Sequence, residues 1–375
     1  MKRANWMYLV ATALVLSTGV SVAGAKARHN DRLSSSGSGI TTDDKGHPHR
    51  GWRFHIDPTT TTYVTTTTTA APPTTAHETT TTVTTTTIAP PVDPPPPDPN
   101  PPAAGAFLSY PHQSGPTTIN GGTNVVVSNE TWQGFSNKTA LVISGAHNVY
   151  LHDLDFADNG GDIFLVNCSG QIRIESIRAR NTGDGTIGSG HGNVIQLNNT
   201  WDNGTGGIRG VKALGGDTED MISIFKSGGI DAAHPLLIEN NHLESPLSGS
   251  LAWSSGSGTG MNLADYGGHD IIARNNTLLN VGQVGIQLNE PTRVTVTNNI
   301  VYGAARPSSN VGISQWASTS CSSCTGNVVA NNRVWWVKSS GTASSIWLSN
   351  SYPVTLSGNA SQDGSIDPSS LHVVL

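Results

Sequence analysis

Apolar and polar residues alternate with a period of two in short segments throughout residues 105–375. One set of segments reads LLIENNHLES from residue 236, IIARNNTLLN from 271, VTVTNNIVYG from 294 and NVVANNRVWW from 327. A second set lies upstream of these, as in DMISIFK from 220 and GIQLNE from 285. A period of two is typical of β-strands, and the helical spacing of apolar residues is absent. The pattern therefore predicts an all-β domain made of many short strands.

The first set recurs at a regular distance along the chain. Taking the first Asn of each Asn-Asn pair, or its equivalent, the repeats fall at positions 153, 176, 210, 240, 275, 298, 331 and 358. The intervals run from 23 to 35 residues and average about 29, which indicates a stacked array. A β-propeller would need four strands in about 40–50 residues, so the intervals are too short for it. We predict a right-handed parallel β-helix, a solenoid of about 8–10 coils.

The Asn-Asn pairs support this architecture. Side-chain amides that stack from coil to coil form ladders of hydrogen bonds. Asn also tolerates the left-handed backbone conformation that a sharp bend between two strands requires. We therefore expect each pair to mark a bend at the same position of successive coils.

These repeats resemble the secreted right-handed parallel β-helix proteins of the pectin lyase-like superfamily, over about residues 105–375. The resemblance implies the fold and an extracellular setting. It implies no single activity, because the superfamily includes polysaccharide lyases, glycoside hydrolases, epimerases, phage tail spikes and adhesins.

The first 104 residues differ in composition from the repeats. Lys2 and Arg3 precede an apolar run and a small-residue cleavage pattern, which predicts a signal peptide over residues 1–25. A retained membrane anchor is the alternative, but the run is shorter than the roughly 20 residues that span a bilayer. Residues 26–57 are polar and aperiodic, and we expect them to be disordered.

A Thr/Pro-rich linker follows over residues 58–104, with 19 Thr and 12 Pro between 58 and 102. It has too little apolar surface to fold, and its prolines stiffen it into a spacer. It is either an O-glycosylated stalk or a passive linker. The organisation predicts a β-helix domain at 105–375 that is secreted or displayed at the cell surface, with no transmembrane segment after signal cleavage.

Overall charge and cysteine content narrow the function classes. The formal net charge of −6 disfavours a nucleic-acid partner, which would require a basic surface. The 42 glycines fit a chain with many turns. Three cysteines are too few for a disulfide framework. Cys321 and Cys324 are predicted to form a short-loop disulfide, the alternative being a redox or zinc pair.

One row of side chains is expected to point outward from the upstream strands. Ile222 and Ile224, and the matching pairs of other coils, face inward, so the residue between them faces outward. Read along the stack, this row contains Phe164, Gln196, Ser223, Asn262, Gln287, Ser314 and Trp347. Planar amides with flanking rings suit a sugar chain, and an ordinary solvated face is the alternative. We take Gln196, Ser223, Asn262, Gln287 and the nearby His269 as candidate substrate-binding residues.

Titratable residues gather in the central repeats. The candidate catalytic residues are His191, Asp217, Asp220, Lys226 and Asp265, which belong to three successive coils. Carboxylates that lie close together raise one another's pKa, which can make an acid and a base from one residue type. The alternative is that Asp217 and Asp220 cap a turn. Pieces of the pectin-hydrolase signature are present, but in reversed order and without its Arg-Ile-Lys element, so its roles are not carried over.

These observations lead to two functional hypotheses. The first is a secreted domain that cleaves a polysaccharide, as a glycoside hydrolase or as a lyase. A lyase would need calcium to acidify the sugar's α-proton and a basic side chain to remove it. The second is a non-catalytic surface module that binds a glycan, adheres or serves as a spacer. In both, the partner is a polysaccharide or cell-surface glycan.

Overall fold

A computed structural model describes residues 41–42, 48–49, 106–183, 192–253, 258–317, 321–349 and 352–375. The predicted signal peptide and the Thr/Pro-rich linker lie outside the described residues. Within the predicted polar segment, strands β1 (Thr41–Thr42) and β2 (Pro48–His49) pair antiparallel. No helix among the described residues is long and apolar enough to cross a membrane.

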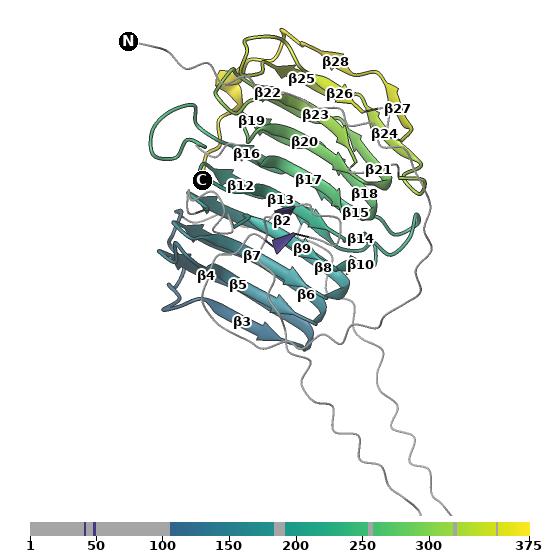
Figure 1. Cartoon of the computed structure of the whole chain (residues 1–375). Helices are drawn as coiled ribbons and strands as arrows, with labels where there is room; N and C mark the ends of the chain where they lie inside the picture. Colours follow the sequence, from purple (N-terminus) through teal and green to yellow (C-terminus); the bar gives the residue numbers. More distant parts are fainter. Residues whose placement is uncertain are drawn as a thin grey trace, which may run out of the picture. The chain divides into compact units, whose positions relative to one another are not determined.

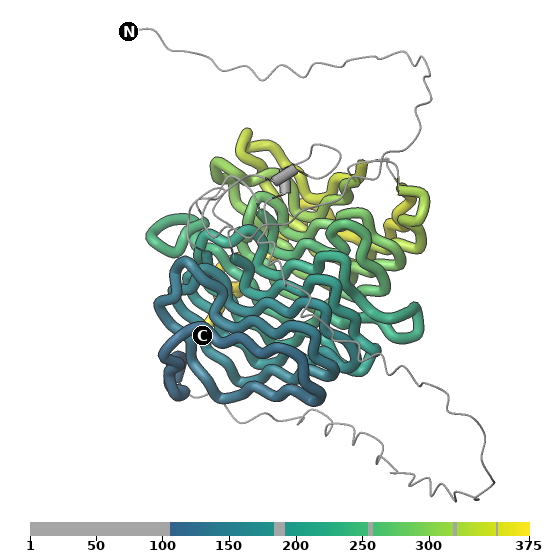
Figure 2. The backbone as a smooth tube through the Cα atoms, turned by 60° about the horizontal axis from the view of Figure 1, so that its bottom comes forward, coloured from purple at the N-terminus to yellow at the C-terminus, as the bar shows by residue number. Residues whose placement is uncertain are grey.

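The described residues between 106 and 375 form an all-β solenoid whose coils stack through parallel strand pairing (Figures 1 and 2). Each coil contributes one strand to a sheet that we call the front sheet, which contains nine strands. In stack order these are β3 (Thr117–Asn120), β5 (Thr139–Ser144), β7 (Gly161–Val166), β9 (Ile195–Asn198), β13 (Asp220–Phe225), β17 (Thr259–Asp265), β20 (Val284–Asn289), β23 (Val311–Trp316) and β26 (Ile346–Leu348). The expected parallel, all-β architecture is therefore present.

The rest of each coil returns through a second set of parallel strands, the return sheet. Its first three coils each use one long strand: β4 (Thr123–Gln133), β6 (His147–Ala157) and β8 (Ser169–Arg180). Later coils split into β10 (Trp201–Asp202), β11 (Gly207–Arg209), β12 (Lys212–Leu214), β14 (Gly228–Gly229), β15 (Leu236–Glu239), β16 (His242–Glu244), β18 (His269–Arg274), β19 (Thr277–Leu279), β21 (Thr292–Thr297), β22 (Ile300–Gly303), β24 (Asn327–Ala330), β25 (Arg333–Trp336), β27 (Val354–Ser357) and β28 (Ala360–Ser361).

The return strands bend at the positions that the repeat predicts. Every predicted bend residue has a positive φ, between 54° and 63°. These residues are Asp153, Ser176, Gly210, Asn240, Asn275, Asn298, Asn331 and Gly358. The left-handed conformation favours Asn, Asp and Gly, which explains the composition of these positions.

The predicted amide ladder is also present, and it is built by the second Asn of each pair. The side-chain Nδ2 of Asn276 donates to Oδ1 of Asn299 at 2.9 Å, and Asn299 donates to Asn332 at the same distance. The ladder continues in both directions, because Asn241 donates in the same way to Asn276 and Asn332 donates to Asn359. Each amide also bonds backbone groups of neighbouring coils, so the bend is fixed from coil to coil.

A continuous apolar core fills the interior of the coils. The inward residues of the front sheet stack in register and are fully buried, and they include Ile195, Ile222, Met261, Ile286 and Ile313. Burying a side chain of this size is worth about 1.5–3 kcal/mol, so this column is a main source of stability.

The C-terminal segment folds back over earlier coils of the return sheet. After β28 the chain forms a short 3-10 helix, η1 (Pro368–Leu371). His242 Nε2 lies 2.6 Å from the carbonyl of Leu371, and Lys212 Nζ donates to the carbonyl of Val374 at 2.8 Å. The C-terminus therefore lies beside β12 and β16 rather than at the end of the stack (Figure 1).

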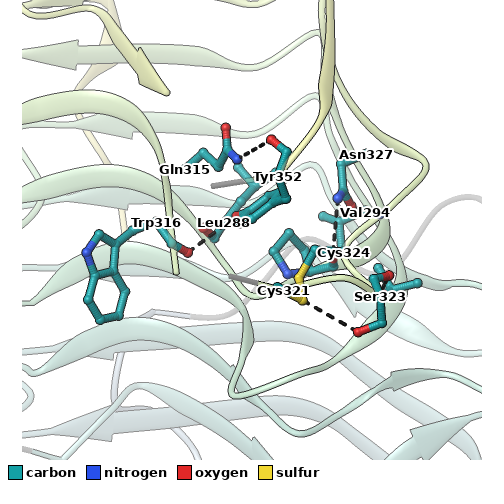
Figure 3. Close-up of a disulfide and its surroundings, with 11 residues drawn as sticks. Leu288, Val294, Gln315, Trp316, Cys321, Ser323, Cys324, Asn327 and Tyr352 are labelled. Atoms are coloured by element: carbon teal, nitrogen blue, oxygen red, sulfur yellow. Dashed lines mark hydrogen bonds between the residues drawn. A yellow bond between two sulfur atoms is a disulfide. The ribbon is translucent and has the colours of Figure 1, made fainter. Parts of the chain in front are cut away.

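A disulfide links Cys321 and Cys324, whose Cα atoms are 5.3 Å apart (Figure 3). It lies within the connection between β23 and β24. Cys168, the remaining cysteine, is buried in the core. The disulfide lies close to Asn327, whose Oδ1 accepts a hydrogen bond from the backbone N–H of Val294 in the preceding coil, so this connection is anchored where β24 begins.

Candidate functional site

The outer face of the front sheet carries the row of side chains expected from the period of two. Gln196 pairs in register with Phe164 on one side and Ser223 on the other. The row continues through Asn262 and Gln287 to Ser314 and Trp347. All seven predicted residues therefore occupy one line across adjacent coils. Amides and hydroxyls fill its centre, and Trp347 ends it. Trp347 is exposed and the two glutamines are partly exposed, whereas the other four residues of the row are buried: Phe164, Ser223, Asn262 and Ser314.

Charged residues are scarce and of one sign on the front sheet. Its nine strands contain Asp162, Asp220 and Asp265 and no Lys, Arg or His. Lys226 follows directly after β13, and Glu290 follows directly after β20. The strands of the front sheet therefore carry only acidic and neutral polar side chains.

Asp220 lies at the start of β13 and is buried. Its carboxylate accepts hydrogen bonds from the backbone N–H of Thr259 at 2.9 Å, from the hydroxyl of Thr259 at 2.7 Å and from Nδ2 of Asn262 at 3.2 Å. Burial raises the pKa of Asp220, and these donors oppose the increase. The carboxylate is thus tied to the row through Asn262.

Asp265 lies at the end of β17 and keeps part of its surface exposed. Its Oδ1 accepts a hydrogen bond from the side-chain amide of Asn289. Removal from water raises the pKa of Asp265 to about 7, and the charges of Asp220 and Glu290 act in the same direction. Asp265 is therefore a carboxylic acid that can hold or release its proton near neutral pH.

Two amides of this face have an acceptor without a protein partner. The Nδ2 groups of Asn262 and Asn289 donate to Asp220 and Asp265, which leaves the opposite oxygens. Among the described residues, neither Oδ1 atom has a hydrogen-bond partner, although the side chains are only 9% and 6% exposed. A buried acceptor without a partner costs about 1–3 kcal/mol. A hydroxyl of a bound molecule would supply the missing donor.

The candidate catalytic residues are not all brought together. Asp220 and Asp265 lie on adjacent strands within electrostatic range, but at opposite ends of those strands. Lys226 donates its backbone N–H to the carbonyl of Asp265 at 2.8 Å, and its Nζ lies 5.3 Å from the ring of Phe225. Asp217 precedes β13 and is buried. His191 lies outside the described residues.

His269 belongs to a different part of the molecule from the row. It is the first residue of β18 in the return sheet, and its ring stacks on Trp201 at 4.6 Å between centroids. Its Nδ1 lies 2.7 Å from Oδ2 of Asp270, which also binds Arg293. The structure therefore separates His269 from the other candidate substrate-binding residues.

Trp316, Asn289 and Thr259 belong to the same face but were not predicted. Trp316 follows Ser314 by two residues, and Asn289 follows Gln287 by two, so the period of two could have identified both. Trp316 and Trp347 are 42% and 49% exposed. No sequence pattern pointed to Thr259, because its hydrogen bonds to Asp220 depend on how two neighbouring coils align.

Among the described residues, no group of three or more His, Cys, Asp or Glu side chains is placed to hold a metal ion. No family model matches the chain, and no curated protein or solved structure matches it.

Proposed function

We propose that this protein binds a polysaccharide along the outer face of the front sheet and hydrolyses it with Asp265 as the general acid. The observation that carries the proposal is the protonatable carboxyl of Asp265, with a pKa of about 7, beside a row of amide and hydroxyl side chains. Successive coils are about 4.8 Å apart, so a sugar chain lying along the stack meets one row residue per coil.

The proposed chemistry follows from the two carboxyl groups. Burial raises the pKa of Asp220, and the three hydrogen bonds that it accepts oppose this increase; when Asp220 is ionised, its charge helps Asp265 to keep its proton. Asp265 donates that proton to the glycosidic oxygen as the bond to the anomeric carbon breaks. Water adds to the anomeric carbon and returns a proton to Asp265. Asp220 stabilises the positive charge that develops on the sugar ring.

A second candidate is binding without cleavage. It is favoured by Asp220, whose carboxylate is buried and already held by Thr259 and Asn262. In this case Asp220 is a structural residue that orients the row, and the face retains a glycan without reacting with it.

The type of β-helix, the secretion and the role of the linker also belong to this proposal. Parallel strands that stack with short connections fit a right-handed parallel β-helix of the pectin lyase-like type, since such crossovers are right-handed in almost all proteins. The signal-peptide pattern supports secretion, and the Thr/Pro-rich linker would then hold the solenoid away from a surface.

The test is to incubate the full-length mature protein with plant, algal and microbial polysaccharides, with and without calcium. New reducing ends without absorbance from unsaturated sugars support hydrolysis. Reducing ends accompanied by that absorbance would indicate a lyase and would contradict Asp265 as the acid of a hydrolase. Retention on glycan columns without products supports the binding-only candidate. Neither products nor retention would refute both.

A further inference from the structure

We infer that the glycan bound by the front sheet is electrically neutral, and that Trp316 and Trp347 form a platform on which its sugar rings stack. This inference rests on the proposed function and names the substrate class of the same face. The resemblance to pectin-degrading proteins would instead suggest an acidic polysaccharide such as a polyuronate.

The front sheet offers an anionic ligand no counter-charge. Its nine strands contain Asp162, Asp220 and Asp265 and no Lys, Arg or His. A polyuronate carries one negative charge per sugar and would find no basic partner in these strands. Taking an unpaired carboxylate out of water is costly. A neutral sugar avoids this cost.

The hydrogen-bonding groups of this face also favour a neutral sugar. The unpartnered Oδ1 atoms of Asn262 and Asn289 are acceptors. Sugar hydroxyls are donors and would satisfy both atoms. A polyuronate has hydroxyls as well, but each of its carboxylates only accepts and would face further acceptors here. The polar groups of this face therefore match hydroxyls rather than carboxylates.

The two exposed tryptophans lie next to each other on this face. Trp347 pairs in register with Ser314, and Trp316 follows Ser314 by two residues, so both indoles start from the same face on adjacent coils. Trp316 directs its ring away from the residues around the disulfide (Figure 3). Trp316 also pairs in register with Asn289, which places an aromatic surface next to an unpartnered acceptor.

Exposed indoles suit the flat C–H faces of neutral pyranose rings, which supply apolar surface without charge. The two large rings are the most exposed aromatic side chains of the described residues, and they lie on one face. A chain of sugars would stack on Trp347 and Trp316 and then continue past Asn289 and Gln287 toward Asp265. The platform thus binds one end of the glycan and the amide row binds the next sugars.

The experiment measures binding of the full-length mature protein to soluble xylan, mixed-linkage β-glucan, galactan and mannan, compared with polygalacturonate and alginate. Each is measured in 0.05 and 0.5 M NaCl, with calcium and with a chelator. We expect binding of at least one neutral glycan that is unchanged by salt and by the chelator. Trp316→Ala and Trp347→Ala should each weaken it about tenfold. Leu356→Ala is the matched control, because Leu356 is also 49% exposed but lies in the return sheet.

The outcomes separate this inference from the proposed function. Binding of a polyuronate alone, with or without calcium, would overturn the neutral substrate class and leave a carbohydrate-directed function standing. Neutral-glycan binding that both tryptophan variants retain would overturn the platform. Failure to bind or cleave any glycan would refute the proposed function itself, and this inference with it.

Discussion

The two sheets of the solenoid share one backbone geometry and use charge in opposite ways. On the return sheet, Glu175, Arg209, Glu239 and Arg274 alternate in sign from coil to coil, with N···O distances between 2.6 and 3.3 Å. On the front sheet the carboxylates have no basic partner within the strands. Arginines neutralise the carboxylates of the return sheet across coils, whereas neutral amides and hydroxyls bind those of the front sheet.

The pKa of each carboxyl group depends on whether an arginine lies beside it. Burial raises the pKa of Glu239, but its bonds to Arg209 and Arg274 outweigh this effect and lower the pKa overall. Burial raises the pKa of Asp162 and of Asp265 to about 7, because neither has an arginine beside it. Buried carboxyl groups without an arginine partner therefore titrate near neutrality, whereas Glu239, held between two arginines, stays ionised.

The largest expected effect tests the paired charges of the return sheet. Arg178 binds Asp155 through two bonds of 2.7 and 2.8 Å, and both side chains are buried. Arg178→Met would leave the Asp155 carboxylate buried without its partner and should lower the free energy of unfolding by about 3–5 kcal/mol. Urea denaturation at pH 7 measures the change. Arg180→Met is the control, since Arg180 is more exposed and should cost less than about 1 kcal/mol.

The pH dependence of stability should follow the buried carboxyl groups that lack an arginine partner. Asp162 and Asp265, with pKa values of about 7, and Asp202, in β10, with a pKa of about 6, favour the protonated form when folded. Their contribution is complete below the unfolded pKa near 4 and is lost as pH rises through 6 to 7. We expect the free energy of unfolding to fall by up to about 6 kcal/mol between pH 5 and pH 8.

Chemical denaturation across this pH range tests the expectation. Asp162→Asn removes one of the groups and should flatten the slope. The carboxylates with lowered pKa values, such as Glu239 and Asp270, act in the opposite sense, and their contribution is lost only below pH 4. A stability that increases between pH 5 and pH 8 would contradict the assignment.

The third prediction concerns activity on the front sheet. Asp265→Asn keeps the shape of the side chain but cannot donate a proton from a carboxyl group, so hydrolysis should fall by about 100-fold or more. Because the variant removes a buried titratable group, it should unfold no more easily than the wild type at pH 8. Reducing-end assays and thermal melts on one preparation check both. Asp231→Asn, an exposed substitution outside the front sheet, should change neither.

The smallest effect concerns Arg274, the last residue in the row of alternating charges on the return sheet. Arg274 is 42% exposed and binds Glu239, which Arg209 also binds. Arg274→Ala should therefore lower the free energy of unfolding by only about 0.5–1 kcal/mol, with a smaller effect in 0.5 M NaCl. Equal losses for Arg274→Ala and Arg178→Met would show that burial does not set the strength of these pairs.

Much of the fold follows from local rules in the sequence. The period of two fixes which side chains face outward, so the whole row from Phe164 to Trp347 could be read from the sequence. The bends could be located because left-handed backbone selects Asn, Asp and Gly at one position of each repeat. Both rules act within a few residues and need no knowledge of distant contacts.

The site was harder to predict because it depends on contacts between coils. The register between β13 and β17 shifts after Ser223, so Phe225 pairs with Asp265, and this irregularity sets the position of the carboxyl. The repeats also place His269 near Asp265 in sequence, but the chain turns into the return sheet between them. Turn lengths vary from coil to coil, so the number of residues between two positions does not show whether they lie side by side on one sheet.

The returning C-terminal segment changes how the solenoid should come apart. Stacked coils contact only their neighbours, so an array of this kind can fray from either end. Here Glu244, in β16, accepts hydrogen bonds from the backbone of Val373 at 2.7 Å and lies 2.8 Å from His372. The last residues of the chain are therefore fastened to a coil in the middle of the stack. Unfolding of the final coil under force or after proteolysis must therefore also break the bonds of the last residues to β12 and β16.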